Sequence, residues 1–466
     1  MRVPAPHLRR PNLRRPHVSG SVIRRWLVPG IGLKRWLLVV FVGELMLALG
    51  GALLLRQVYR EYDFSGPGQS VLYTVTLQFF PYWVRGVIVG VAGVGLFAYG
   101  SWRAIRVLMG PFSRPEGDQP LVEVIYQKRF LSRGPKVVVI GGGTGLSTLL
   151  RGIKEHTSNI TAVVTVADDG GSSGRLREEL GIPAVGDIRN CIVALADSEP
   201  LMGELLQYRF PGEGEAGLGG HTVGNLLLAA MASVQGDDFE EGVRQMNRVL
   251  AVRGQVVPAT GTAVTLHARL VDGAEVVGQS EIAKSTRIDR VWLTPEDVSA
   301  GDDARRAVDE ADLIVVGPGS LYTSIMPSLL LPELLAAVRA SEAVKLYVCN
   351  VATQRGETQG YDLAGHLGAL ERHTGAGWID VILANNRFDA KRPGGYEAEA
   401  VKLRWPPAVS AGAAGAHTHL PRLVLEDVVD PENAHHHEPA RLAAAGMRVY
   451  EREAFGRHRP RVSRTA

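Results

Sequence analysis

The stretch 136-KVVVIGGGTGLSTLLRGIKEH-156, continued by 160-ITAVVTVADDGG-171, decides the fold of this chain. Its first apolar run passes into a glycine cluster and then into a helix-compatible segment, and the second run ends in acidic and glycine residues. Neither run alternates between apolar and polar positions, which is typical of strands in a parallel sheet covered on both faces. We therefore predict an α/β, Rossmann-like domain with a mostly parallel sheet and helices on both faces.

Later segments extend the same pattern. Strand candidates occupy residues 311–317, 343–351 and 378–386. No period of about 20 to 50 residues recurs, so a solenoid or propeller is not indicated. We expect one α/β domain over residues 136–447, followed by a basic tail over 448–466.

Two apolar runs precede this domain. Residues 36–55 (WLLVVFVGELMLALGGALLL) have the length and composition of a bilayer span, and the shorter run at 84–102 carries aromatic residues near its end. We predict a two-helix transmembrane hairpin over 36–102, between a basic leader (1–35) and a juxtamembrane linker (103–135). Glu44, near the middle of the first run, is either a polar contact within the hairpin or a carboxyl group without functional duty.

The charge distribution orients this hairpin. Residues 1–136 contain 19 Lys/Arg and 6 Asp/Glu, whereas the remainder of the chain has an acidic excess. Because Lys and Arg concentrate on the cytoplasmic side of membrane proteins, we expect a two-span inner-membrane protein with both termini and the main domain in the cytoplasm. The acidic remainder argues against nucleic acid as a partner. The two cysteines, Cys191 and Cys349, are far apart in the sequence, so neither a disulfide framework nor a zinc site is expected.

The first glycine cluster is a candidate phosphate site, with a purely structural turn as the alternative. It lies between a strand and a helix, where backbone N–H groups and the helix dipole favour an anion. It matches neither the GxGxxG fingerprint, since Leu146 stands at the last glycine position, nor the P-loop, since no Gly-Lys-Ser/Thr follows. The predicted ligand residues here are Gly141, Gly142, Gly143, Thr144 and Gly145.

Acidic residues follow the second predicted strand. Asp168 and Asp169 could hold a ribose or a divalent cation, or could simply cap the next helix. A later turn supplies Asp187, Arg189 and Asn190, of which the arginine could grip a phosphate in a bidentate manner. An internal Asp–Arg pair is the alternative at that turn.

Three further turns are candidate parts of the same crevice. His221 and Asn225 precede an apolar helix and either reach a ligand or only cap that helix. A second glycine turn after a strand, 317-GPGSLYTS-324, is either a phosphate cradle or a structural turn. Asn350 ends the next strand. Ligand sites in open α/β sheets lie beyond the carboxyl ends of the strands, so these residues are expected to share one site. The predicted ligand residues from the second glycine turn are Gly319, Ser320 and Thr323.

The motifs, taken together, resemble the YvcK branch of the CofD-like family. The matching segments are KVVVIGGGTGLSTLLRGIK, VTVADDGGSSGRLREELGIPAVGDIRNCIVALA, GGHTVGNLLLAAM, DLIVVGPGSLYTSIMPSLL and YVCNVATQRGETQGY, in that order. The resemblance covers about residues 136 to 447 and leaves the predicted hairpin as an addition. It implies a domain that binds UDP-sugars such as UDP-N-acetylglucosamine or UDP-glucose, and a regulator of cell shape and envelope growth under gluconeogenic conditions.

The resemblance also leaves an enzymatic alternative open. CofD relatives are transferases that join 2-phospho-L-lactate to a deazaflavin with a guanylylated donor and Mg²⁺, so a transferase and an Mg²⁺ cofactor are the second reading. No catalytic residue can be named, and the case for an enzyme rests on analogy alone. Envelope-synthesis proteins are candidate partners, and a homo-oligomer stays open.

One late segment departs from the family pattern. At 435-HHHEP-439 the family usually has Arg-His-Asp before the proline, so His436 replaces the arginine and Glu438 the aspartate. A phosphate contact carried by that arginine is therefore in doubt. Metal binding by His435, His436 and His437 is not expected, because adjacent histidines rarely converge on one ion.

Overall fold

The computed structural model describes residues 79–109, 131–196, 199–212, 217–391, 398–405 and 420–457, together with single positions between 41 and 74. The chain divides into two compact units, Met1–Tyr126 and Gln127–Ala466. The first unit contains one long helix, α4 (Tyr82–Met109, 28 residues), which includes the predicted second span, and the described positions between 41 and 56 are also helical. Most of the predicted first span, 36–55, lies outside the described residues.

None of the single helices in the described part of the chain combines the length and hydropathy of a membrane span. A bent pair of segments, Leu321–Leu329 with Pro332–Ala340, does so by length and composition. Leu321, Ile325 and Leu329 of this pair are fully buried inside the α/β unit, as core residues of a globular domain are. The transmembrane hairpin therefore stays a prediction.

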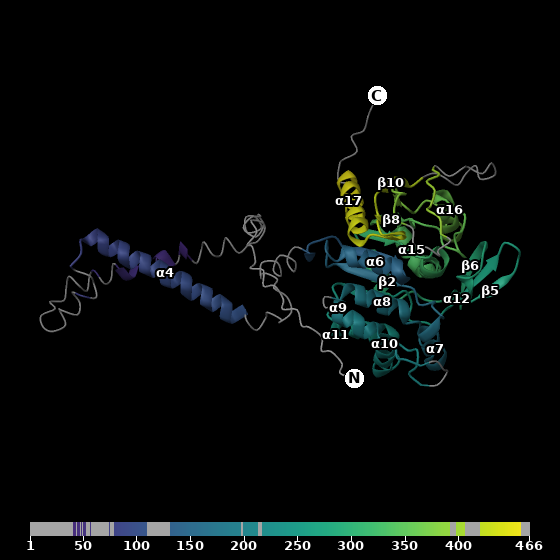
Figure 1. The fold of residues 1–466 in the computed structure, drawn as a ribbon, viewed down its shortest axis with the longest axis horizontal. Coiled ribbons are helices and arrows are strands. Elements are labelled where there is room, and N and C mark those ends of the chain that lie inside the picture. The colour runs from purple at the N-terminus through teal and green to yellow at the C-terminus, as the bar shows by residue number, and fades with distance from the viewer. Residues whose placement is uncertain are drawn as a thin grey trace, which may run out of the picture. The chain divides into compact units, whose positions relative to one another are not determined.

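The second unit is built on a seven-stranded sheet in which every pairing is parallel (Figure 1), which confirms the predicted fold class. Its central strands are completely buried and show no alternation of inside and outside positions. The order across the sheet is β10-β9-β8-β7-β1-β2-β3. The strands are β1 (Val137–Gly141), β2 (Ile160–Val164), β3 (Gln255–Pro258), β7 (Leu313–Val316), β8 (Val344–Val348), β9 (Val381–Asn385) and β10 (Arg422–Glu426).

Helices pack on both faces of this sheet, because the two halves of the chain wind in opposite directions from its centre. One face carries α6 (Gly143–Ile153), α8 (Gly186–Leu195) and α17 (Pro439–Arg457). The other carries α13 (Asp302–Asp309), α14 (Met326–Leu329), α15 (Pro332–Ala340) and α16 (Leu363–Thr374). The remaining helices are α7 (Gly171–Leu180), α9 (Glu199–Gln207), α10 (Val223–Val234), α11 (Phe239–Val249), α12 (Gln279–Ile282) and the π-turn η3 (Leu321–Ile325).

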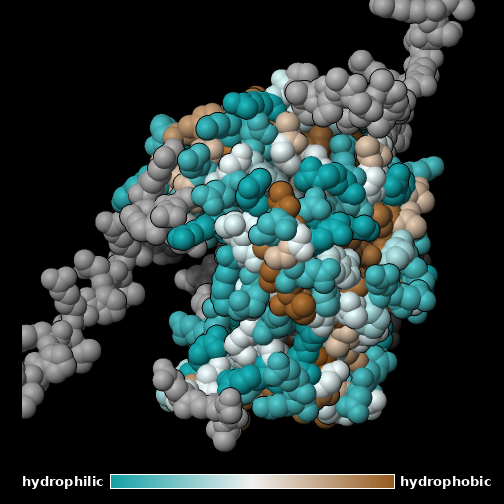
Figure 2. Space-filling view, turned by 90° about the vertical axis from the view of Figure 1, so that its right-hand side faces the viewer, coloured by the Kyte–Doolittle hydropathy of each residue, from teal (hydrophilic) through white to brown (hydrophobic). Residues whose placement is uncertain are grey.

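Between β3 and α13 the chain forms a small sheet that the sequence did not predict. It is antiparallel, in the order β5-β4-β6, with β4 at Thr265–Leu270, β5 at Glu275–Val277 and β6 at Ile288–Thr294. The face of the molecule that carries it is mainly hydrophilic, with a few separate hydrophobic groups near its middle (Figure 2). A two-stranded sheet, β11 (Val429–Asp430) with β12 (Asn433–His437), precedes α17.

Helices and buried residues extend across the predicted domain boundaries. Residues 103–109 of the predicted linker continue α4, and residues 131–135 pack on the α/β unit, where Leu131 is buried. The predicted tail from residue 448 is helical up to Arg457, and Val449 is buried. Apolar residues spaced along α17 hold this last segment on the domain.

Candidate ligand site at the sheet switch point

The two halves of the sheet diverge between β1 and β7, and we call the carboxyl ends of these strands and the loops that follow them the crevice. The chain leaves β1 toward β2 and β3, and leaves β7 toward β8, β9 and β10. Such a switch point opens a ligand site beyond the carboxyl ends of the strands. The glycine loops that follow the two strands meet there, since a Cβ on Gly145 would come within 2.7 Å of the Pro318 carbonyl oxygen.

The first glycine loop places a helix N-terminus in the crevice. The 11-residue helix α6 begins at Gly143, whose φ of +66° favours glycine. The first amides of a helix have no partner within it, so they are available to an anion. The carboxyl group of Asp187 lies beside Gly142 and Gly143. Thr144 and Gly145 supply the next amides.

Asp168 and Asp187 form a pair of neighbouring carboxyl groups at this point. Asp168 follows β2 and accepts the N–H of Gly170 at 3.0 Å, and burial raises its pKa. Asp187 lies in the first turn of α8, and burial and the charge of Asp168 raise its pKa to about 7. The pair can accept hydrogen bonds from ligand hydroxyls or share a proton.

Asp169, the neighbour of Asp168 in the sequence, binds a different part of the chain. Its Oδ1 accepts the backbone N–H of Ser280 at 2.8 Å, and its other oxygen packs against Gly278. Asp169 therefore anchors the start of α12 and the small sheet to the loop after β2. A ligand contact of Asp169 stays a prediction.

Arg189 is held by the protein. Its Nη1 donates to Thr222 Oγ1 at 2.7 Å and to Asn225 Oδ1 at 3.1 Å, and its Nη2 donates to Asn190 Oδ1 at 2.9 Å. The guanidinium thus donates to hydroxyl and amide oxygens, and it also interacts through its charge with Asp187 and Asp168, as the alternative of an internal Asp–Arg pair expects. The phosphate contact stays a prediction. Arg189 joins the first turn of α8 to the start of α10.

The same network continues through buried side chains to α7. Asn225 Nδ2 donates to Ser172 Oγ at 3.0 Å, and Ser172 Oγ lies 3.0 Å from His221 Nδ1. Burial lowers the pKa of His221, which keeps the ring neutral at pH 7. The N-cap residue of α10 is Thr222. The sequence had suggested a capping role for His221 and Asn225 instead. His221 and Asn225 thus brace the wall of the crevice.

The second glycine loop is bonded by residues that follow β8. Asn350 accepts the N–H of Gly319 at 3.2 Å and donates to its carbonyl oxygen at 2.8 Å. Ser320 Oγ donates to Gln354 Oε1 at 2.7 Å, and Thr323 Oγ1 donates to Glu357 Oε1 at 2.5 Å. These three donors are bonded within the protein, which favours the structural-turn alternative for the second loop. Ligand contact by this loop stays a prediction.

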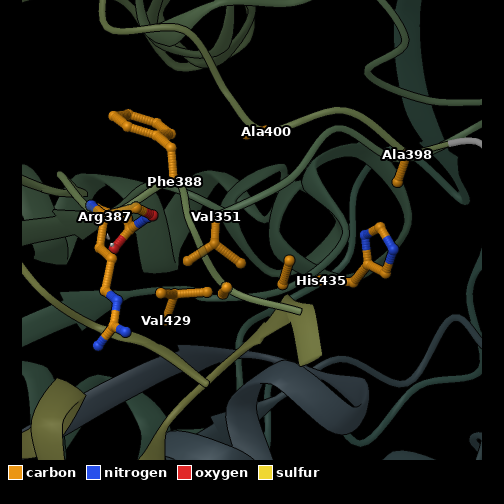
Figure 3. A pocket seen from close by; sticks show the side chains of 10 residues that line it. Val351, Arg387, Phe388, Ala398, Ala400, Val429 and His435 are labelled. Atoms are coloured by element: carbon orange, nitrogen blue, oxygen red, sulfur yellow. Dashed lines mark hydrogen bonds between the residues drawn. The ribbon is translucent and has the colours of Figure 1, made fainter. Parts of the chain in front are cut away.

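The histidine run lies on β12, near the carboxyl edge of the sheet where β8 and β9 end. His437 is buried, and burial lowers its pKa to about 4, whereas His436 is exposed. His435 borders a cavity of about 10 Å³ (Figure 3), which has room for one water molecule. The other lining residues of this cavity are Val351, Asn385, Arg387, Phe388, Ala390, Ala398, Ala400, Val429 and Ala434. In the described ranges no cluster of three or more His, Cys, Asp or Glu side chains is arranged to hold a metal.

A larger hollow, of about 450 Å³, lies at the opposite ends of the strands. It is bordered by the starts of β1, β2 and β3 and by the ion pair of Lys136 with Glu310. We favour the switch-point crevice as the functional site. Among the described residues, a helix N-terminus, two glycine loops and two carboxyl groups with raised pKa values converge there.

The family profile described as 2-phospho-L-lactate transferase CofD matches residues 137–404 of this chain. The chain belongs to the CofD family. Within this CofD-family protein the matched region contains both glycine loops, Asp168, Asp187 and the network around Arg189, but not the first unit.

Relatives of this chain within the family include proteins named gluconeogenesis factors. The gluconeogenesis factor of Bacillus subtilis is 49% identical over 284 residues, which cover 58% of this chain and 89% of that protein. The gluconeogenesis factor of Halalkalibacterium halodurans is 53% identical over 250 residues, which cover 53% of this chain and 77% of that protein. A Deinococcus radiodurans relative is 38% identical over 451 residues, covering 92% of this chain and 90% of that protein. This CofD-family protein is thus a homologue of gluconeogenesis factors.

A solved structure agrees with the fold. The crystal structure of a UPF0052-family protein from Bacillus halodurans has a TM-score of 0.60 and 44% identity, and covers 68% of this chain and 99% of that chain. The α/β fold of the CofD-family protein is therefore shared with an experimentally solved relative.

Several residues of the site were missed by sequence reasoning. Gln354 and Glu357 lie in the polar stretch 353-TQRGETQG-360, which was noticed as a family segment without a role for either residue. Gln279 and Ser280 follow a strand that was not predicted. A polar cluster directly after a buried strand was the available signal for the first pair, and nothing local indicated the second.

Proposed function

We propose that this CofD-family protein binds a nucleoside diphosphate sugar, such as UDP-N-acetylglucosamine or UDP-glucose, and acts as a regulator. The observation that supports this most directly is the N-terminus of α6 beside the carboxyl pair of Asp168 and Asp187 at the switch point. Amides at a helix N-terminus suit a diphosphate, and carboxylates suit the hydroxyl groups of ribose or of a sugar.

Each group of the ligand has a counterpart in the crevice. The amides of Thr144 and Gly145 would take phosphate oxygens, while Asp168 would accept ribose or sugar hydroxyls. The pKa of about 7 for Asp187 lets this residue be neutral when an anionic ligand approaches. The backbone of Pro318 and Gly319 would close the opposite wall.

We infer the physiological role from the relatives and from the predicted tether. Proteins named gluconeogenesis factors share this domain, and we infer control of cell shape and envelope growth under gluconeogenic conditions. The predicted hairpin would hold the domain at the inner membrane, close to membrane-bound envelope-synthesis proteins as partners. Deleting residues 1–110 should release a folded domain from the membrane fraction. Full restoration of cell shape by the truncated form would refute the role of the tether.

A second candidate function is that of a CofD-like transferase. The carboxyl pair favours it, because Mg²⁺ is commonly bound by one or two carboxylates together with ligand phosphates. Asp168 and Asp187 would hold the ion, which would supply charge neutralisation for the transferred group. The two functions differ in one observable, since a regulator leaves its ligand intact.

Calorimetry on the full-length chain in detergent tests the proposal. UDP-N-acetylglucosamine or UDP-glucose should bind saturably and more tightly than NAD or GTP, and chromatography should recover the sugar nucleotide intact. Asp168→Asn should weaken binding by about 1–3 kcal/mol, the cost of losing one charge-assisted partner, whereas the exposed Asp297→Asn should not. Preference for a guanine nucleotide with magnesium-dependent turnover would move the protein to the transferase class.

A further inference from the structure

Glu357 is a buried glutamate that serves the second glycine loop. Its side chain is 2% exposed, and burial raises its pKa. Its Oε2 accepts the N–H of Tyr322 at 2.9 Å and that of Thr323 at 3.3 Å, and its Oε1 accepts the Thr323 hydroxyl at 2.5 Å. Burying a carboxyl group is costly, so a residue that only filled space here would be apolar.

The bonds of Glu357 continue a series that runs along the whole loop. Asn350 holds both backbone groups of Gly319, Gln354 holds the hydroxyl of Ser320, and Glu357 holds the next turn. From the other side, Gln279 donates to the carbonyl oxygen of Thr323 at 3.1 Å. The loop after β7 is therefore clamped in one conformation by side chains that are distant in the sequence.

That conformation matters for the first glycine loop. Gly145 at the start of α6 touches the backbone of Pro318 and Gly319 so closely that a Cβ would come within 2.7 to 2.9 Å of it. A Cβ on Gly319 would in turn lie 3.3 Å from the carbonyl oxygen of Gly142. The packing leaves no space between the two loops, so a shift of the second loop toward α6 would displace the helix N-terminus.

We propose that Glu357 is a positioning residue of the ligand site: it fixes the turn of Tyr322 and Thr323 and thereby sets the geometry of the α6 N-terminus for a nucleoside diphosphate sugar. This inference rests on the proposed function for the identity of the ligand. The clamp itself is a property of the protein without ligand. Glu357 acts through the two loops and does not contact the ligand.

The test compares three variants of the full-length chain. Glu357→Ala removes all the acceptor oxygens, and Glu357→Gln keeps one for the amides of Tyr322 and Thr323. Glu333→Ala is the matched control, because Glu333 also accepts a backbone N–H, that of Ala300 at 3.2 Å, but lies on α15 away from the crevice. Calorimetry with UDP-N-acetylglucosamine gives affinity, thermal melting gives stability, and hydrogen–deuterium exchange reports on peptides covering 141–146 and 317–325.

Glu357→Ala should weaken binding by about tenfold or more, and should raise exchange in both peptides. Glu357→Gln should recover most of the affinity. Glu333→Ala should lower the melting temperature without changing the affinity, so a loss of stability alone is distinguished from a loss of positioning. If Glu357→Ala does not fold, Gln354→Ala replaces it, with a smaller change in the same direction.

Two results would overturn the inference. One is an affinity of Glu357→Ala equal to that of the wild type. The other is increased exchange confined to 317–325, because the second loop would then move without affecting α6. Failure of the proposed function would give a different result, because the wild type would then bind no UDP-sugar. Hydrogen exchange of residues 141–146 in Glu357→Ala would still show whether Glu357 positions the first loop.

Discussion

Gly145 in the first turn of α6 lies against the carbonyl oxygen of Pro318, which would be 2.7 Å from a Cβ at that position. Gly145→Ala should therefore force the two glycine loops apart and cost about 1–3 kcal/mol of stability, as overpacking usually does. Gly368→Ala is the matched control: Gly368 is also helical, in α16, but has open space around its Cα. The control should gain about 0.5–1 kcal/mol from helix propensity. Chemical denaturation measures the free energy of unfolding, which should fall in Gly145→Ala and rise in Gly368→Ala.

Replacement of Asp187 should change the dependence of stability on pH. Burial and Asp168 raise its pKa in the folded protein to about 7, against about 4 in the unfolded chain. The stability contributed by its protonated form is complete below about pH 4 and is lost as the pH rises to about 7. Asp187→Asn should therefore be more stable than the wild type at about pH 8, by at least about 1 kcal/mol, and should lose that advantage toward about pH 4.

The measurement is thermal melting of both proteins across this pH range. Asp297→Asn, which changes an exposed carboxyl group, should follow the wild type at every pH. An advantage of Asp187→Asn that is equal at pH 4 and pH 8 would contradict the raised pKa.

Arg189→Lys should destabilise the protein without ligand. A lysine ammonium cannot donate hydrogen bonds to Thr222, Asn225 and Asn190 together as the planar guanidinium does. We expect a loss of about 1–3 kcal/mol. Arg248→Lys, at an exposed position in the last turn of α11, is the control and should change little. Unchanged melting of Arg189→Lys, together with weaker ligand binding, would instead support the direct phosphate contact predicted from the sequence.

Reporter fusions test the predicted membrane topology. A reporter fused after Ala466 should be active only if it is of the cytoplasmic type, because the basic leader and linker flank the two apolar runs. A reporter inserted between the runs, near residue 65, should show the opposite behaviour. Activity of a periplasmic reporter after Ala466 would reverse the orientation.

The sequence by itself determined the architecture of the α/β unit and the place of its site. Apolar runs without alternation marked β1, β2, β7, β8 and β9, and glycine and acidic residues after them marked the crevice. These signals are local, because a buried strand and a tight turn each require particular residues at neighbouring positions.

Tertiary structure alone decided what each polar residue of the site does. Asp169 binds Ser280, Arg189 binds Asn225, and Glu357 binds Thr323. The partners in these three pairs are 111, 36 and 34 positions apart in the sequence, respectively. Such pairs form where loops from different strands meet at one edge of the sheet, and the amino-acid types of two distant residues do not reveal that meeting. For the same reason the sequence could not show that donors of the second glycine loop bond to side chains that follow β8.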